Sequence, residues 1–216
     1  SSLEGQILVG STKGIFSFYD DKIAPLETTS GFNKILLEVS IKDIHFISEH
    51  EIWYSTFGQG ILLHDPSSFH TIGLEKGLNT GGSIHDLVYD NSNIYVGTNN
   101  GLYIISSVDY SIKHFTKASG LPTNKVLGID IGSKGIAYLA TTKGLSIFDG
   151  MSFTNYKRGD GLPSNLILSV LVDSENPNII WLGSRKGITK FETFNSACAA
   201  IKKKVFNKLK GFNANI

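Results

Sequence analysis

The six histidines and the single cysteine are the residue types of this chain that most often carry catalysis or hold metals. The histidines lack the close spacings of a metal site. His85 and Asp86 are neighbours in a strand-like segment, where successive side chains point to opposite faces, so they make a poor catalytic pair. Cys198 has no evident activating neighbour, and Gly58-Gln59-Gly60 lacks the third glycine of a dinucleotide loop. Asp173-Ser174-Glu175-Asn176 could hold calcium, but a simple turn is favoured. The sequence therefore predicts a protein that is not an enzyme and has no metal and no cofactor.

Amide and basic side chains at recurring turn positions are better candidates, because they can bind a polar ligand. Amides donate and accept hydrogen bonds, and lysine and arginine pair with carboxylates. Such a set suits a sugar or the carboxylate of a uronic acid. The competing interpretation is that these residues form turns and carry solvated charges. The candidate ligand-binding residues are Lys13, Gln59, Asn79, Asn99, Asn100, Asn124, Lys143, Asn165, Arg185 and Lys186.

A five-fold repeat supplies the elements that position these candidates. A short apolar strand ending in Gly-Thr, Ala-Thr or a similar small pair, then a tight turn and a glycine, recurs along the chain. The glycines lie at positions 14, 60, 101, 144 and 187, spaced by 46, 41, 43 and 43 residues. Short strands with a period of roughly 40–50 residues are typical of β-propeller blades. The sequence therefore predicts an all-β propeller of four-stranded antiparallel blades over residues 1–195.

The third repeat shows the expected blade most clearly. We predict strands over 84–89, 94–98, 102–105 and 112–116, with Asn99-Asn100-Gly101 as a hairpin turn of the primed type. Links of the form Gly-Leu-Pro-x-Asn then lead into the next blade. They occur at 120–124 and 161–165, with weaker copies at Gly77-Leu78-Asn79 and Gly31-Phe32-Asn33.

Propeller topology brings the ten candidates to one surface. The hairpin between strands two and three and the link between blades lie at the same end of each blade, around the central channel. This end is the predicted ligand face. Trp53 and Trp181 resemble sugar-stacking residues, but both lie in the second strand of a repeat and are expected to pack between blades.

The repeats resemble the two-component regulator propeller repeat over about residues 6–193. The resemblance rests on Ile-Trp/Tyr-Val/Leu-Gly-Thr/Ser, a short turn, Gly-Leu/Ile and Gly-Leu-Pro-x-Asn. The second repeat departs from it with Tyr54-Ser55-Thr56 and with Asn79 in place of proline. The resemblance implies a sensor region of a bacterial two-component or hybrid sensor kinase, in the periplasm or outside the cell. Many such regions respond to polysaccharide fragments.

The number of blades follows less directly. Residues 7–28 hold only strands two to four of a repeat, and residues 167–193 only strands one to three. We expect five blades. The alternative is an open arc of a larger, seven-bladed ring.

Charge separates the C-terminal segment 196–216 from the rest. Residues 1–196 hold 15 basic and 19 acidic residues, whereas the last twenty residues hold five lysines and no acid. Ala197, Ile201, Val205 and Leu209 recur at helical spacing, which predicts a basic amphipathic helix. It could meet a membrane surface or a partner, pack over the last blade, or link to a further domain. The start at Ser1-Ser2 indicates a trimmed or processed chain.

These observations favour a non-enzymatic propeller that senses a carbohydrate or similar polar ligand. The expected partners are an oligosaccharide, and a protein partner or a second copy of the chain. The propeller body has no basic, aromatic-studded face for nucleic acid, and membrane contact is expected only through the tail. A protein-binding scaffold is the alternative. A polysaccharide lyase or glycosidase is a third interpretation, which would require an acid and base pair near the channel.

Overall fold

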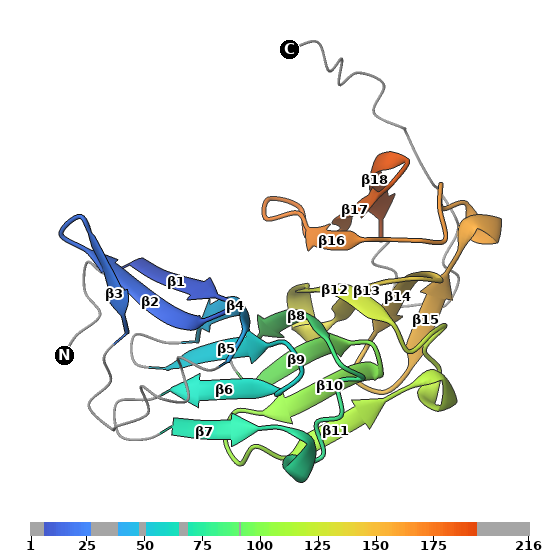
Figure 1. Ribbon diagram of the computed structural model, residues 1–216. Helices are drawn as coiled ribbons and strands as arrows, with labels where there is room; N and C mark the ends of the chain where they lie inside the picture. The colour runs from blue at the N-terminus through green and yellow to red at the C-terminus, as the bar shows by residue number, and fades with distance from the viewer. Residues whose placement is uncertain (1–6, 27–38, 48–50, 65–68, 91, 194–216) are drawn as a thin grey trace. The chain divides into compact units, whose positions relative to one another are not determined.

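The structure is a computed structural model that describes residues 7–26, 39–47, 51–64, 69–90 and 92–193. These residues form antiparallel sheets joined by short loops and 3₁₀ turns (Figure 1). No helix in the described ranges is long and apolar enough to cross a membrane. The expected tail helix at 196–216 and the weak link at Gly31-Phe32-Asn33 lie outside the described residues.

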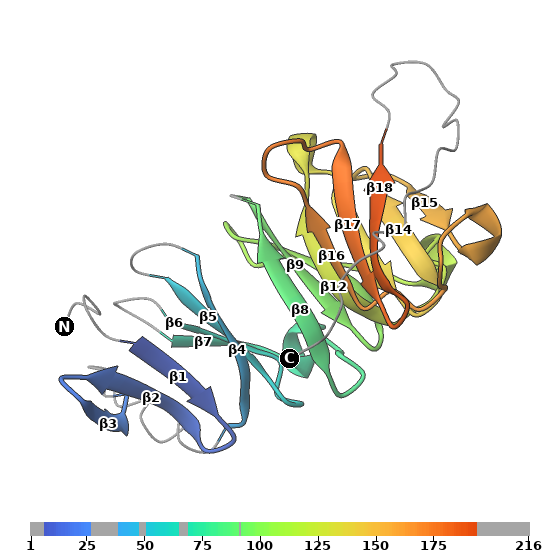
Figure 2. The same cartoon turned by 90° about the horizontal axis from the view of Figure 1, so that it is seen from above.

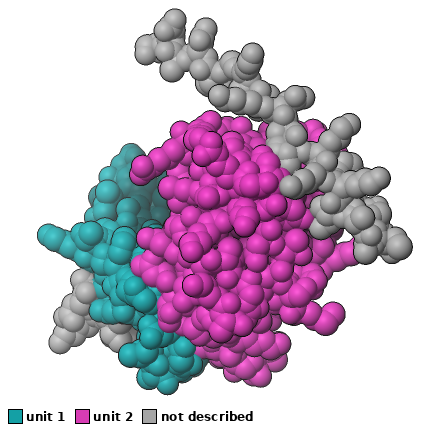
Figure 3. Space-filling model, turned by 90° about the vertical axis from the view of Figure 1, so that its right-hand side faces the viewer, with its two compact units in different colours: residues 1–84 teal, residues 85–216 magenta. Residues whose placement is uncertain are grey.

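The chain divides into two compact units, residues 1–84 and 85–216, which Figure 3 shows in two colours. Unit 1 contains a three-stranded and a four-stranded sheet. The first sheet is β1 (Ile7–Ser11), β2 (Gly14–Tyr19) and β3 (Lys22–Pro25), and the second is β4 (Ile41–Phe46), β5 (Ile52–Thr56), β6 (Ile61–His64) and β7 (Phe69–Ile72).

Unit 2 holds the remaining sheets (Figure 2). The third sheet is β8 (Ile84–Tyr89), which begins where the units divide, β9 (Asn93–Thr98), β10 (Gly101–Ser106) and β11 (Ile112–Phe115). The fourth is β12 (Val126–Ile131), β13 (Ala137–Thr141), β14 (Gly144–Phe148) and β15 (Phe153–Tyr156), and the fifth is β16 (Ser169–Val172), β17 (Ile179–Ser184) and β18 (Gly187–Glu192).

Neighbouring strands in every sheet are consecutive in the chain, as in a propeller blade. The predicted strands of the third repeat are confirmed to within a residue at each end. Within the described residues the first and last sheets have three strands each, as expected for residues 7–28 and 167–193. How the ring closes, and with it the choice between five blades and an open arc, stays a prediction.

Apolar side chains from adjacent sheets form the cores within each unit. In unit 2, Tyr95 and Leu102 of the third sheet share a buried cluster with Leu139 and Phe148 of the fourth. A second cluster joins the fourth and fifth sheets. Because an inner sheet is covered on both faces, nearly every residue of its central strands is buried, as in β9 and β13.

A glycine near the end of the second strand of the first and third repeats allows close packing against the following sheet. A Cβ on Gly97 would lie 3.1 Å from Val126 Cγ1, and one on Gly10 would lie 2.7 Å from Ile41 Cγ2. A larger side chain would force the sheets apart. The small residue in the repeated motif is therefore a packing requirement.

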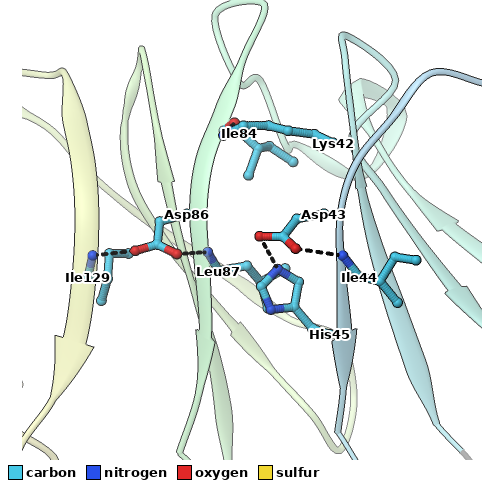
Figure 4. Close-up of polar contacts among 8 residues, drawn as sticks. All are labelled: Lys42, Asp43, Ile44, His45, Ile84, Asp86, Leu87 and Ile129. Carbon is cyan, nitrogen blue, oxygen red and sulfur yellow. Dashed lines mark hydrogen bonds and ion pairs between the residues drawn. The ribbon is translucent and has the colours of Figure 1, made fainter. Parts of the chain in front are cut away.

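Aspartates on the first strands connect consecutive sheets in unit 2. Asp86 accepts hydrogen bonds from Leu87 N at 2.9 Å in its own strand and from Ile129 N at 2.7 Å in β12 (Figure 4). Asp130 repeats the arrangement with Ile131 N at 2.8 Å and Val172 N at 2.6 Å in β16. In unit 1, Asp43 accepts from Ile44 N at 2.9 Å and lies 3.6 Å from His45 Nε2. Each of the two bridging carboxylates, of Asp86 and Asp130, therefore accepts a hydrogen bond from a backbone N–H on the first strand of the next sheet, which is an edge strand.

Candidate ligand-binding site

A serine or threonine hydroxyl fixes each hairpin that carries a candidate residue. The hydroxyl of Thr98 donates to Gly101 O at 2.9 Å and accepts from Asn100 N at 3.0 Å. The same pair of bonds occurs at Ser11, Thr56, Thr141 and Ser184, where the accepted N–H belongs to Lys13, Gln59, Lys143 and Lys186. The serine or threonine at this position of the repeat therefore holds the backbone of these candidates at equivalent places in the five sheets.

The prediction of a primed turn at Asn99-Asn100-Gly101 is wrong. Among these three residues only Gly101 has positive φ, at 123°, whereas a primed turn needs positive φ at its first central residue. The hydroxyl of Thr98 supports a turn with ordinary φ at both asparagines, and the glycine takes the strained position after it. Gly144 repeats this geometry with φ of 125°.

The links between sheets are 3₁₀ turns closed by a glycine. η2 (Lys117–Ser119) and η4 (Arg158–Asp160) end at Gly120 and Gly161, with φ near 109° and 106°. The following Leu121 and Leu162 are buried in the clusters between sheets, where they fill the gap between neighbouring sheets.

Two of the candidate amides hold these links together. The side-chain oxygen of Asn124 accepts from Lys117 N at 2.8 Å, and that of Asn165 accepts from Arg158 N at 2.7 Å. The same bond occurs in both links, so the asparagine of Gly-Leu-Pro-x-Asn has a structural role that requires no ligand. Asn99 and Asn100 also have partners within the third sheet, since Asn99 Oδ1 lies 2.8 Å from Nε2 of His85 in β8 and Asn100 Nδ2 lies 3.4 Å from the Tyr103 hydroxyl in β10.

Hairpins and links lie at the same end of a sheet, as the topology predicts. In the fourth sheet, Thr142 N donates to Lys125 O at 3.4 Å and Thr142 Oγ1 to Thr123 Oγ1 at 3.3 Å. In unit 1, Phe57 N donates to Ser40 O at 3.0 Å. The candidates of each unit therefore lie at one loop end of their sheets.

A cavity of about 260 Å³ opens at this end of the second sheet. It brings together Gln59 from the β5–β6 hairpin and Asn79 from the link after β7. The rest of the lining is Gly58, Gly60, Leu74, Glu75, Leu78, Thr80 and Gly82. Gln59 and Asn79, two of the sequence candidates, thus share this cavity.

Glycines and the missing proline open this cavity. In the other links, Pro122 and Pro163 follow the buried leucine, whereas Asn79 follows Leu78 here. Gly58, Gly60 and Gly82 all have positive φ, and they place backbone instead of side chains in the lining. The departures of the second repeat from the repeat pattern therefore coincide with the cavity.

Glu75 is the charged residue of the lining, and the sequence analysis did not identify it. It lies in η1 (Leu74–Lys76), and its Oε1 accepts from Gly73 N at 3.1 Å. A comparison of the links in the sequence could have identified it. Glu75 lies two residues before Gly77, where the next link has the uncharged Ala118 two residues before Gly120. Its charge disfavours an anionic ligand in the cavity and favours a neutral or cationic one.

None of the basic candidates is among the residues that line this cavity, and each lies on the hairpin of another sheet. Lys13 is exposed on the first sheet, Lys143 on the fourth, and Arg185 and Lys186 on the fifth. The structure therefore does not add these cations to the cavity that contains Gln59 and Asn79.

Other side chains singled out in the sequence have the following surroundings in the structure. Among the described residues, no group of three or more histidines, cysteines or acids could hold a metal ion. Asp173 accepts from Glu175 N, Asn176 N and the Trp181 indole, so the acidic segment forms a turn, and these bonds lower the pKa of Asp173. Trp53 is fully buried, as expected for a packing residue.

Comparison with known proteins places the fold. No protein-family model and no curated protein matches the sequence. The chain is similar to the extracellular domain of BT3049 from B. thetaiotaomicron, a protein described as a hybrid two-component system. The TM-score is 0.70 and the identity is 22%, over 99% of this chain and 28% of that chain. The extracellular domain of BT4673 from B. thetaiotaomicron, described as a one component system, has a TM-score of 0.67 and 19% identity, over 89% and 26%.

A third similar structure is the WD40 β-propeller domain of Doa1, with a TM-score of 0.61 and 16% identity, over 87% of this chain and 60% of that chain. The chain thus spans little more than a quarter of the two extracellular domains, which it covers to 28% and 26%. The sheets described above and these likenesses together show that the chain has the β-propeller fold.

Proposed function

We propose that this chain is a ligand-sensing propeller module that binds a neutral, hydroxyl-rich ligand, such as an oligosaccharide, without transforming it. The observation that carries the proposal is the cavity between the β5–β6 hairpin and the link after β7. Its amides and backbone groups can exchange hydrogen bonds with sugar hydroxyls, and Glu75 can accept from them.

Apolar groups beside the cavity support a sugar ligand. Leu74, which lines the cavity, and Phe57, next to Gly58 of the lining, are both mostly exposed. Apolar and aromatic side chains commonly line ligand sites and pack against the apolar part of the ligand. A sugar ring presents such a part together with its hydroxyls.

The likeness to extracellular domains of two-component proteins supports a sensing role and a location in the periplasm or outside the cell. The chain spans only part of the length of those domains. The proposed role of this module is recognition alone.

Thermal unfolding against a panel of oligosaccharides tests the proposal. A neutral oligosaccharide should raise the unfolding midpoint with concentration, since a ligand that binds only the folded state stabilises it. Gln59→Ala should weaken binding roughly fivefold, the loss of about one neutral hydrogen bond. Arg185→Ala, on a hairpin of the fifth sheet, is the matched control and should leave this affinity unchanged.

A second variant tests the charge of the site. Glu75→Gln keeps the size of the side chain and removes its charge, so it should raise affinity for acidic oligosaccharides relative to neutral ones. If acidic sugars bind best to the unmodified chain and Arg185→Ala abolishes that binding, the cavity assignment is wrong and the basic hairpins hold the ligand.

A protein-binding scaffold is the second candidate function. Phe57 and Leu74 favour it, because exposed apolar side chains at loop ends also serve as protein contacts. A chain that no sugar stabilises would favour this alternative.

A further inference from the structure

The first sheet has an exposed apolar face that follows the register of its strands. Directly paired residues share a face, and the pairs form two rows, Ile7–Phe18–Ile23 and Val9–Phe16–Pro25. We call these six residues the leading face. Ile7 is 60% exposed and Ile23 67%. The opposite face, with Leu8 and Gly10, packs against the second sheet.

The equivalent face is buried in the later sheets. In the fourth sheet the matching row is Ala137–Phe148–Phe153, in which Ala137 and Phe148 are at most 2% exposed. In the fifth sheet, Ile180, Leu182 and Phe191 of this face lie in the cluster shared with the fourth sheet. A leading face is therefore the surface on which the preceding sheet packs.

The fifth sheet exposes the complementary kind of face. Its rows are Leu171–Trp181–Lys190 and Ser169–Gly183–Ile188, and we call these six residues the trailing face. Leu171 is 59% exposed and Ile188 58%.

The third sheet shows how a trailing face is used. Its Tyr95, Gly97, Leu102 and Ile104 hold the register positions of Trp181, Gly183, Ile188 and Lys190. Tyr95, Leu102 and Ile104 share one buried cluster with Ala137, Leu139 and Phe148 of the fourth sheet. A trailing face therefore packs on a leading face.

Leu171 holds the position of the bridging aspartate in the fifth sheet and makes its trailing face more apolar. Asp130 pairs with Tyr138 in the fourth sheet, and Leu171 pairs with Trp181 at the same register position in the fifth. Asp130 bonds to the next sheet through its carboxylate. Leu171 can contribute only apolar contact, so burial against another sheet is what would stabilise it.

We propose that the trailing face of one copy of this chain packs on the leading face of a second copy. Ile7 and Ile23 of the leading face and Leu171 and Ile188 of the trailing face are each more than half exposed. The interfaces between sheets inside unit 2 already join these two kinds of surface. The contact is heterologous, because the two copies use different faces. Such contacts join copies head to tail into a ring or a filament.

Sedimentation velocity across a range of protein concentrations tests this inference. The mass of the unmodified chain should rise with concentration. Ile23→Glu on the leading face and Leu171→Glu on the trailing face should each reduce the chain to a monomer, since each places a charge in the apolar contact. Met151→Glu is the matched control, because Met151 is 92% exposed in a turn outside both faces, and it should associate like the unmodified chain.

Mixing the two variants gives the decisive result. Ile23→Glu keeps a working trailing face, and Leu171→Glu keeps a working leading face. An equimolar mixture should therefore form a dimer with one copy of each and nothing larger. If either variant fails to fold, as judged by circular dichroism, Ile7→Glu or Ile188→Glu replaces it on the same face.

Three outcomes would overturn the inference. A monomeric chain at every concentration would mean that the faces have no partner copy, or that each is covered within its own chain. Association that survives both substitutions, or two monomeric variants that do not rescue one another, would show a contact of another kind. Sugar binding at Gln59 involves neither face, so these outcomes leave the proposed function untouched.

Discussion

The leading face of the first sheet and the equivalent face of the fourth sheet have the same cross-strand pairing pattern. They differ in what covers them. Phe148 pairs with Ala137 and Phe153 and is 2% exposed. Phe18 pairs with Ile7 and Ile23, which are both more than half exposed. The comparison teaches that the repeat specifies an apolar face in each sheet, whereas burial of that face depends on whether another sheet precedes it.

Removing the equivalent aromatic ring from each sheet should show the largest difference. Phe148→Ala should lower the free energy of unfolding by about 3–5 kcal/mol, because it leaves a cavity in a closed core. Phe18→Ala should cost about 1–2 kcal/mol, since its ring is only partly buried. Urea unfolding at low protein concentration measures both values. Equal costs would show that the leading face is covered in solution.

The hairpin glycines of the fourth and fifth sheets extend the comparison to the outer strand. Both Gly144 and Gly187 have positive φ, near 125° and 101°. A Cβ on Gly144 would overlap the carbonyl oxygen of Tyr156 in β15, whereas one on Gly187 would meet no described atom within 4 Å. The difference arises because the described fifth sheet has no fourth strand.

Alanine at these two glycines should therefore have unequal effects. Gly187→Ala should cost about 1–2 kcal/mol, the strain of a left-handed conformation. Gly144→Ala should cost roughly 1–3 kcal/mol more, because the backbone must also move away from the overlap. Urea unfolding compares the two. A cost at Gly187 that matches the cost at Gly144 would indicate that an outer strand packs beside β18 in solution.

The local repeat explains why so much of the fold could be predicted from the sequence. The spacing of Gly101, Gly144 and Gly187 marks hairpins whose glycines no other residue could easily replace. The expectation of three strands each in residues 7–28 and 167–193 followed from counting apolar segments around these glycines. These features depend on interactions a few residues apart, so one sequence is enough to identify them.

Contacts between repeats could not be predicted in the same way. The bridging role of Asp86 depends on Ile129, 43 residues away, and nothing in the segment around Asp86 shows that its carboxylate faces an N–H of another sheet. The predicted turn at Asn99 and Asn100 failed because the hydroxyl of Thr98 supports a different turn. A turn type depends on such side-chain bonds as well as on the Asn-Gly pair.

The candidate site shows the same division. Gln59 and Asn79 were found because hairpins and links must lie at one end of a sheet. Glu75 was missed, because the cavity forms where glycines, and Asn79 in place of a proline, leave space. The cations on other hairpins satisfied the same topological rule, but topology does not indicate which loop residues surround a cavity.

The turns before the outer strands provide the smallest test of the comparison. In the first sheet, Asp20 and Asp21 form the turn between β2 and β3 with φ of 50° and 57°. In the third sheet, Asp109 holds the corresponding turn with its carboxylate, which accepts from Ser111 Oγ at 2.8 Å and Ser111 N at 3.1 Å. Bonds from the Ser106 and Ser111 side chains lower the pKa of Asp109 to about 2.

This lowered pKa predicts a loss of stability in acid. The folded pKa lies below the unfolded value of about 4, so the ionised carboxylate stabilises the folded chain above that pH. Its contribution is lost as the pH falls from about 4 to about 2. Asp109→Asn should reduce the fall in unfolding midpoint over this range, and the effect should be small because Asp109 is exposed. Ser111→Ala keeps the charge but removes a donor, so it should weaken the pH dependence in the same direction. An unchanged pH dependence in both variants would show that the backbone, and not the carboxylate of Asp109, holds the turn.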